Sequence, residues 1–253
     1  MILFRKAGGS KLVGEFKFLC AEALRPAIAP LILQFQETAR YEVIVGYANV
    51  GTITDRLRKG EVVDLAVVSP EQWGSLSQDK ILRPTLRAPL AKIGIALAVR
   101  AGATKPDVSS ITGLKQALLA SGTIAIIDPA KGSPSGVRAI KLFELLGIVA
   151  EVQSRVKLVE ASDEVFQALA DGAADLGINQ ASEVAAHPQV DSAGRLPDAA
   201  QFYTEFVAGI PTTALQADGA SKLVEFLMSP RSAALFKAKE IGVGEVIQTS
   251  LPG

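Results

Sequence analysis

The segment Thr123–Gly136 reads TIAIIDPAKGSPSG, and the predicted fold starts from it. Its beginning is a short apolar run typical of a buried strand, and the polar, glycine- and serine-rich loop that follows leads into a helical pattern. Val137, Ile140 and Phe143 carry that pattern, and Gly147 ends the helix. Strand, polar loop and helix in this order form the unit from which parallel α/β sheets are built.

The same unit recurs in the first half of the chain. A strand is predicted over Phe16–Cys20, followed by a helix that contains Pro30, so either an early helix start or a kink must accommodate this proline. A second strand, Tyr41–Tyr47, leads through a polar turn into a helix that ends near Gly60. A third strand is predicted over Asp64–Val68 directly afterwards.

The second half repeats the pattern and is bounded by two longer apolar segments. A short helix precedes a strand at Asp175–Ile178, whereas Ile93–Val99 and Phe202–Ile210 are long enough to cross between two lobes. Helices within Ala217–Lys239 would return to the first lobe. We therefore predict an α/β clamshell with two lobes, each a mostly parallel sheet flanked by helices, joined by two crossing strands. The predicted boundaries are 1–98 and 205–253 for lobe 1, and 99–204 for lobe 2.

The composition argues against several functional classes. Lys and Arg number 26 and Asp and Glu number 26, so the chain lacks the excess positive charge that attracts nucleic acid. Cys20 and His187 are the only residues of their types, which disfavours a Cys/His metal centre and rules out an internal disulfide. Gly136 is followed by Val137-Arg138 rather than by Lys and Ser or Thr, so the loop is not a standard phosphate-binding loop. We expect no metal, no cofactor and no nucleic-acid partner.

The chain also shows no membrane-spanning pattern. It has no apolar run approaching the roughly 18 residues that a spanning helix requires. Met1–Ser10 contains an apolar run of only four residues, shorter than the roughly 7–15 of a signal peptide. The chain as given therefore carries no predicted export signal, and a cytoplasmic location is one alternative.

Polar loops are predicted at one edge of each sheet. Parallel α/β sheets bind ligands outside the carboxyl ends of their strands, and a helix N-terminus there can hold an anion through unpaired N–H groups. The loops at this edge are Ala21–Arg25, Asn49–Thr52, Ser133–Gly136 and Asn179–Ser182. Glu183 lies at the end of the last one. The alternative is that residues such as Ser133 and Ser135 merely cap their helix. The candidate ligand-binding residues are Glu22, Ala23, Leu24, Arg25, Asn49, Val50, Gly51, Thr52, Asp128, Gly132, Ser133, Ser135, Gly136 and Gln180.

The order of these loops resembles that of a known family. The segments DPAKGSPSG at Asp128–Gly136 and ADLGINQASE at Ala174–Glu183 are similar to those of the molybdate-binding-like bacterial solute-binding proteins, and the resemblance runs from about Lys17 to Val243. It implies the class-two periplasmic-binding fold, in which two lobes close on a small anionic ligand. It also implies a periplasmic monomer that works with the membrane component of an ABC transporter.

The departures from that family narrow the expected ligand. Where members that bind molybdate have hydroxyl side chains, this chain has Ala23, Val50-Gly51 and Gln180. The resemblance is closer to a branch with Ala-x-Arg-Pro-Ala at Ala23–Ala27 and Gln-x-Ser-Glu at Gln180–Glu183, which includes proteins that isomerise aconitate. The expected ligand is a small anionic solute, a carboxylate or another oxyanion, and the missing hydroxyl donors favour the carboxylate over a tetrahedral oxyanion.

Three functional hypotheses follow. The first is a binding protein whose donors to the anion are Arg25, Asn49, Thr52, Ser133, Ser135 and Gln180. The second is a cofactor-free isomerase of aconitate-like tricarboxylates, with Glu22 as the candidate base and Lys131 or Tyr203 as substitutes. The third is a cytoplasmic ligand sensor that acts through a partner.

Overall fold

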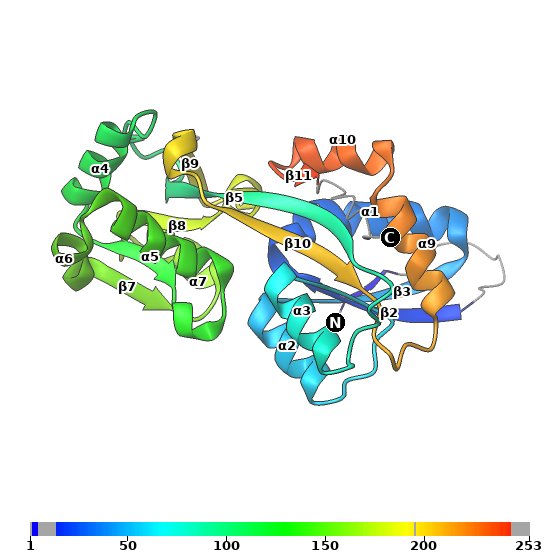
Figure 1. Cartoon of the computed structure of the whole chain (residues 1–253). Helices are drawn as coiled ribbons and strands as arrows, with labels where there is room; N and C mark the ends of the chain where they lie inside the picture. The colour runs from blue at the N-terminus through cyan, green and yellow to red at the C-terminus, as the bar shows by residue number, and fades with distance from the viewer. Residues whose placement is uncertain (1, 5–13, 195, 244–253) are drawn as a thin grey trace.

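Two long antiparallel strands connect the lobes of the molecule. The computed structural model describes residues 2–4, 14–194 and 196–243, and most of Met1–Ser10, on which the expectation about an export signal rests, lies outside them. Figure 1 shows β5 (Ala88–Arg100) and β10 (Tyr203–Gly209) running side by side from one lobe to the other. The predicted α/β clamshell with two crossing strands is therefore confirmed.

The first lobe contains three parallel strands, β3, β2 and β4, extended by β1 and β10 at its two sides. The strands are β1 (Ile2–Phe4), β2 (Gly14–Ala21), β3 (Tyr41–Ala48) and β4 (Leu65–Val68). The helices of this lobe are α1 (Arg25–Ala39), α2 (Val50–Arg58), α3 (Pro70–Gln78), α9 (Ala217–Leu227) and α10 (Pro230–Ala238). The C-terminal helices thus return to the first lobe, as the sequence predicts.

The second lobe repeats this arrangement with the parallel strands β8, β6 and β7, next to β5. The strands are β6 (Ile124–Ile127), β7 (Val156–Val159), β8 (Leu176–Gln180) and β9 (Val190–Gly194). A short β11 (Gly242–Val243) lies next to α10 in the first lobe and pairs with Ala91 and Lys92 of β5. The helices are α4 (Ile111–Ala120), α5 (Pro134–Leu146), α6 (Val149–Val152), α7 (Ser162–Ala170) and α8 (Ala181–Ala186). Strand β7 was not predicted from the sequence, because Lys157 interrupts its short apolar run.

The hydrophobic core is divided between the lobes. One cluster draws on the chain up to Ile93 and again from Phe206, and it contains the buried side chains of the first lobe. Two further clusters, beginning at Ile95 and Ala96, pack within the second lobe. The change from one core to the next therefore occurs within the crossing strands. The domain boundaries given above stay a prediction.

Helix α1 resolves the question of Pro30. The helix begins at Arg25 with Pro26 in its first turn, and Pro30 lies inside it. Pro30 has no N–H to donate to the carbonyl of Pro26, so the helix forgoes one internal hydrogen bond. The early start places Arg25 at the end of the helix that faces the second lobe.

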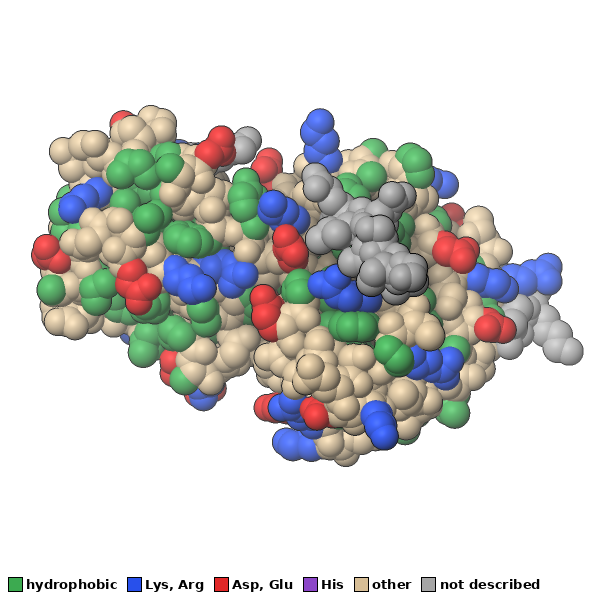
Figure 2. Space-filling view, in the orientation of Figure 1, with side chains coloured by type: hydrophobic (Ala, Val, Ile, Leu, Met, Phe, Trp, Pro, Cys, Tyr) green, Lys and Arg blue, Asp and Glu red, His purple; other side chains and the backbone are tan. Residues whose placement is uncertain are grey.

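The surface of the molecule carries both signs of charge. On the face in Figure 2, basic and acidic side chains are interspersed over both lobes, and no large patch of one sign is present on that face. None of the helices in the described part of the chain is both long enough and apolar enough to cross a bilayer.

Candidate functional site

A cavity of about 330 Å³ lies between the lobes. The parallel registers explain its position, because Ala21 ends β2 beside Ala48 of β3, and Ile127 ends β6 beside Val159 of β7. The loops after these strands therefore meet at the same place. The predicted residues that line the cavity are Glu22, Ala23, Arg25, Asn49, Val50, Thr52, Ser133, Ser135 and Gln180.

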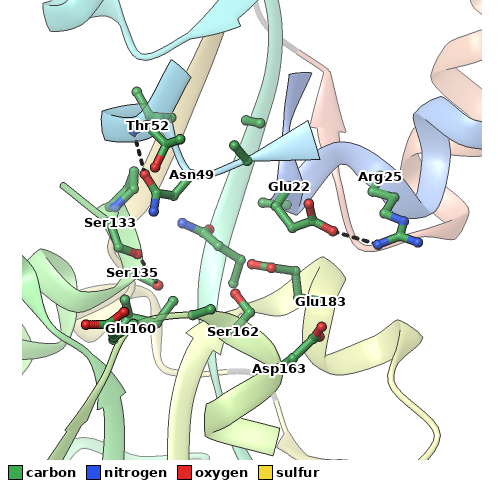
Figure 3. A pocket seen from close by; sticks show the side chains of 18 of the residues that line it. Glu22, Arg25, Asn49, Thr52, Ser133, Ser135, Glu160, Ser162, Asp163 and Glu183 are labelled. Atoms are coloured by element: carbon green, nitrogen blue, oxygen red, sulfur yellow. Dashed lines mark hydrogen bonds and ion pairs between the residues drawn. The ribbon is translucent and has the colours of Figure 1, made fainter. Parts of the chain in front are cut away.

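One side of the cavity offers uncharged donors at two helix N-termini (Figure 3). Asn49 is the N-cap of α2, and its Oδ1 accepts a hydrogen bond of 2.8 Å from the Thr52 N–H. Ser133 occupies the N-cap position of α5, but its side chain makes no capping hydrogen bond. Its hydroxyl oxygen instead lies 3.0 Å from that of Ser135, and both residues are buried. Simple helix capping therefore does not explain these serines.

The opposite side of the cavity carries carboxyl groups. Glu22 accepts a hydrogen bond of 3.0 Å from Nη1 of Arg25, and this bond raises the pKa of the guanidinium. The Arg25 side chain is half exposed and its guanidinium carbon lies 5.6 Å from the centre of the Tyr47 ring. Its charge is thus paired with Glu22, although Arg25 also lines the cavity. Asp163 also lines this side.

Glu183 stands out among these carboxyl groups. It lies in the first turn of α8, and Figure 3 shows its carboxyl group directed into the cavity beside Ser162. The residue keeps some exposure, but withdrawal of its carboxyl group from water raises the pKa to about 7, against a lowering effect of the hydrogen bond with Ser162. The negative charges of Glu22 and Asp163 raise it further.

Gln180 lies in the wall between the two sides of the cavity. It is 3% exposed, and its amide nitrogen donates a hydrogen bond of 2.9 Å to the hydroxyl of Thr204 on β10. Within the described part of the chain, its Oε1 has no hydrogen-bond partner. A buried polar atom without a partner is costly, and a ligand in the cavity could satisfy it.

The loop between β7 and α7 completes the cavity and was missed by the sequence analysis. Glu160, Ala161, Ser162 and Asp163 all line it. Ala161 is the N-cap residue of α7, and its side chain accepts no hydrogen bond. The first N–H groups of α7 therefore have no side-chain acceptor at the cap. The signal in the sequence was a Ser-Asp pair before a helical pattern, but without β7 nothing placed that pair at the sheet edge.

Five predicted ligand-binding residues do not line the cavity. Leu24 is fully buried in the core of the first lobe, and Asp128 caps a short turn by accepting a bond of 2.9 Å from the Ala130 N–H. A Cβ on Gly136 would lie 2.1 Å from the Ile127 carbonyl oxygen, so this glycine lets α5 pack on β6. The other two are Gly51 and Gly132, which lie at a contact between the lobes.

Two of the candidate catalytic residues also lie elsewhere. Lys131 forms an ion pair of 2.8 Å with Glu160, which raises the pKa of its ammonium group and keeps it protonated. Tyr203 is 39% exposed, and the Lys92 ammonium lies 4.4 Å from the centre of its ring. Only Glu22 of the three candidates borders the cavity.

The lobes contact one another on both sides of the cavity. On one side, a Cβ on Gly51 would lie 2.9 Å from the Lys131 carbonyl oxygen and 3.1 Å from the Cα of Gly132. On the other side, the Ser182 hydroxyl donates a hydrogen bond of 2.6 Å to the Ala23 carbonyl. A groove of about 380 Å³ next to this second contact shares Glu22, Arg25, Asp163 and Glu183 with the cavity. Among the described residues, no group of His, Cys, Asp and Glu side chains could hold a metal ion.

Comparison with known proteins identifies the family of this chain. Residues 16–239 match the family described as "Bacterial extracellular solute-binding protein". An aconitate isomerase from a Pseudomonas species is 30% identical over 182 residues, which cover 72% of this chain and 68% of that protein.

Solved structures share the fold at lower identity. The periplasmic molybdate-binding protein of Azotobacter vinelandii is similar with a TM-score of 0.74 and 19% identity, over 91% of this chain and 100% of that one. The substrate-binding protein of an ABC transporter from Agrobacterium tumefaciens has a TM-score of 0.73 and 17% identity, over 92% of this chain and 80% of that one.

Proposed function

Because this chain belongs to the bacterial extracellular solute-binding proteins, we propose that its interlobe cavity binds a small carboxylate-bearing solute in the periplasm. The bound solute would be delivered to the membrane component of an ABC transporter, the type of system to which the similar Agrobacterium protein belongs. The observation that carries the proposal is the side of the cavity where Ser133 and Ser135 of one lobe face Asn49 and Thr52 of the other.

This side suits a carboxylate. The N-termini of α2 and α5 each supply partial positive charge, and they come from opposite lobes. Hydrogen bonds to a charged group are worth about 1.5–3 kcal/mol each, so a few of them offset desolvation of the ligand. A carboxylate bridging the two helices would also favour the closed arrangement of the lobes.

The size and charge of the cavity favour an organic acid over a tetrahedral oxyanion. Its volume of about 330 Å³ corresponds to roughly ten water molecules at about 30 Å³ each, more than a five-atom oxyanion fills. A compact anion held at the serines would leave the opposite side of the cavity, with Arg25, Glu22 and Glu183, unfilled. A longer solute that places one carboxylate at the serines and a second carboxyl group beside Arg25 reaches both sides.

A thermal-shift panel tests this proposal. We expect cis-aconitate, trans-aconitate or citrate to raise the melting temperature, and molybdate and sulfate to raise it less. Replacing both serines, Ser133→Ala with Ser135→Ala, should remove most of the shift, because it deletes both hydroxyl donors. Ser154→Ala, at an exposed position outside the cavity, is the matched control. A shift with molybdate alone, or an unchanged shift in the double variant, would contradict the proposal.

A second candidate function is isomerisation of an aconitate-like tricarboxylate. Two observations favour it: the 30% identity to an aconitate isomerase, and a protonatable carboxyl group, Glu183, directed into the cavity. Such a reaction needs a base near a carbon-bound proton of the ligand and needs no cofactor. Proton NMR spectroscopy of cis-aconitate incubated with the protein tests it, and the appearance of trans-aconitate is the expected result.

A further inference from the structure

We propose that Glu183 is the catalytic acid–base group of the cavity, which takes a proton from one carbon atom of a bound unsaturated carboxylate and returns it to another. This inference rests on the second function proposed above. It replaces Glu22, Lys131 and Tyr203, the residues that the sequence suggested for this role.

The position of Glu183 gives it access to both a ligand and solvent. It borders the interlobe cavity and also the adjoining groove of about 380 Å³. Its carboxyl group is directed into the cavity, on the side opposite Ser133 and Ser135 (Figure 3). A ligand whose carboxylate lies at the two serines would therefore extend its carbon skeleton toward Glu183.

The groups around Glu183 adjust it for proton transfer. Burial of the carboxyl group, together with the charges of Glu22 and Asp163, raises its pKa to about 7. A general base is most effective when its pKa lies near the working pH. The hydrogen bond with Ser162 restrains the carboxyl group and lowers the pKa in part. Further ionisable groups here are Glu160 in the cavity, Arg25, whose guanidinium donates to Glu22, and His187, which lines the groove.

The alternatives are less suited to the role. One oxygen of Glu22 accepts a hydrogen bond from the Arg25 guanidinium, and its side chain is 34% exposed. Lys131 is held protonated by Glu160, and Tyr203 lies on the surface under Lys92. Glu183 lines the cavity, and burial of its carboxyl group raises its pKa to about 7.

The chemical step balances without an oxidant or a cofactor. The ionised Glu183 carboxylate removes a proton from the methylene group next to the double bond, and the electron pair spreads over the allylic carbons and the adjoining carboxylate. The donors at the N-termini of α2 and α5 would hold the ligand's carboxylates while this charge develops. Glu183 then returns the proton to the other end of the allylic unit. One C–H bond breaks, one forms, and the double bond moves.

Deuterium exchange separates this inference from simple binding. The full chain is incubated with cis-aconitate and with trans-aconitate in heavy water, and the ligand is followed by NMR spectroscopy, with a thermal shift recorded for each variant. We expect the wild-type protein to introduce deuterium at the ligand carbon and to interconvert the isomers. Glu183→Gln should lower both rates by about 10²–10⁴-fold and retain the thermal shift. Glu225→Gln, an exposed carboxyl on α9 outside the cavity, is the matched control and should leave the rates unchanged.

Each contrary outcome overturns a different statement. Exchange at the wild-type rate in folded Glu183→Gln protein would overturn the role of Glu183 and leave the isomerase function intact. A thermal shift without exchange in the wild type would overturn both the isomerase function and this inference, and leave ligand binding intact. If Glu183→Gln does not fold, Glu183→Asp serves instead, because it keeps the carboxyl group but withdraws it by one methylene. That variant should slow exchange at least about tenfold, and an unchanged rate would overturn the inference.

Discussion

At the scale of single residues, the protonation of Glu183 depends on neighbours that the sequence does not place beside it. Its neighbours Ser162, Asp163 and Glu22 come from other segments of the chain, and they decide whether its carboxyl group holds a proton near neutral pH. The same applies to Arg25, whose charge is directed to Glu22 before any ligand arrives. Local chemistry at this site is therefore a property of neighbours brought together by folding.

The raised pKa of Glu183 predicts a pH-dependent stability. From about 4.5, the ordinary value, to about 7, the folded state binds the proton more strongly than the unfolded state, so the free energy of unfolding should fall as pH rises through this range. Glu183→Gln should remove this decline and be more stable than wild type at pH 8 by on the order of 2 kcal/mol, with no difference at low pH. Denaturant unfolding at several pH values measures this. A difference that does not vary with pH would argue against the raised pKa, and Glu225→Gln should follow the wild-type profile.

Ser162 gives a second prediction at this scale. Its hydrogen bond lowers the pKa of Glu183, so Ser162→Ala should move the midpoint of the Glu183 titration to higher pH. Carbon-13 NMR of the labelled Glu183 carboxyl group reports that midpoint directly. A midpoint that stays in place or moves to lower pH would show that Ser162 does not stabilise the ionised form.

At the scale of the elements, two helix N-termini determine what the cavity can hold. The side chain of Asn49 caps α2 by accepting a hydrogen bond from a backbone N–H, whereas the side chain of the cap residue of α5 makes no such bond. The difference arises at Ser133, whose oxygen lies against Ser135 inside the cavity. Helix α5 can therefore present both backbone and hydroxyl donors to a ligand. Its close approach to β6 depends on Gly136.

The packing of α5 on β6 gives a third prediction. In Gly136→Ala, the new methyl group would lie 2.1 Å from the Ile127 carbonyl oxygen, so the helix must shift and the free energy of unfolding should fall by about 1–3 kcal/mol or more. Gly74→Ala is the matched control, since Gly74 lies within α3 with no atom near its added Cβ. That variant should gain about 0.5–1 kcal/mol from helix propensity. Equal effects of the two substitutions in urea unfolding would contradict the packing argument.

At the scale of the whole molecule, the lobes meet through few contacts on either side of the cavity. Gly51 touches Gly132 on one side, and Ser182 bonds the Ala23 carbonyl on the other. The crossing strands β5 and β10 carry the change from one hydrophobic core to the next. Figure 1 shows that these two strands connect the lobes, and each hydrophobic cluster lies within one lobe.

The glycine contact predicts an effect on ligand affinity without an effect on the cores. In Gly51→Ala, the methyl group would meet the backbone at Lys131 and Gly132 at 2.9 and 3.1 Å, so the lobes could not close as far. Affinity for the carboxylate ligand should fall about tenfold, which corresponds to about 1.4 kcal/mol. Calorimetric titration measures the affinity, and small-angle scattering should show less compaction on ligand addition than in wild type. Wild-type affinity in this variant would mean that closure does not depend on the contact, and Gly74→Ala again serves as the control.

The sequence alone determined the elements and their order. Apolar runs ending in polar loops, as at Thr123–Gly136, predict strands followed by helices wherever burial is regular along the chain. This regularity located four of the loops around the cavity, and the segments DPAKGSPSG and ADLGINQASE in two of them carried the resemblance to the family. It failed at β7, because Lys157 interrupts the short apolar run, and the loop that carries Ser162 was missed together with the strand.

Tertiary structure alone decided which of the predicted residues share the cavity. It brought Glu183 to Glu22, removed Lys131 and Tyr203 to the surface, and joined Ser182 to Ala23, which is 159 positions away in the chain. Periodicity records only whether a side chain faces a core or solvent. Burial, hydrogen bonding and the pKa of a carboxyl group depend on distances between atoms of separate segments, and these distances exist only once the lobes have packed.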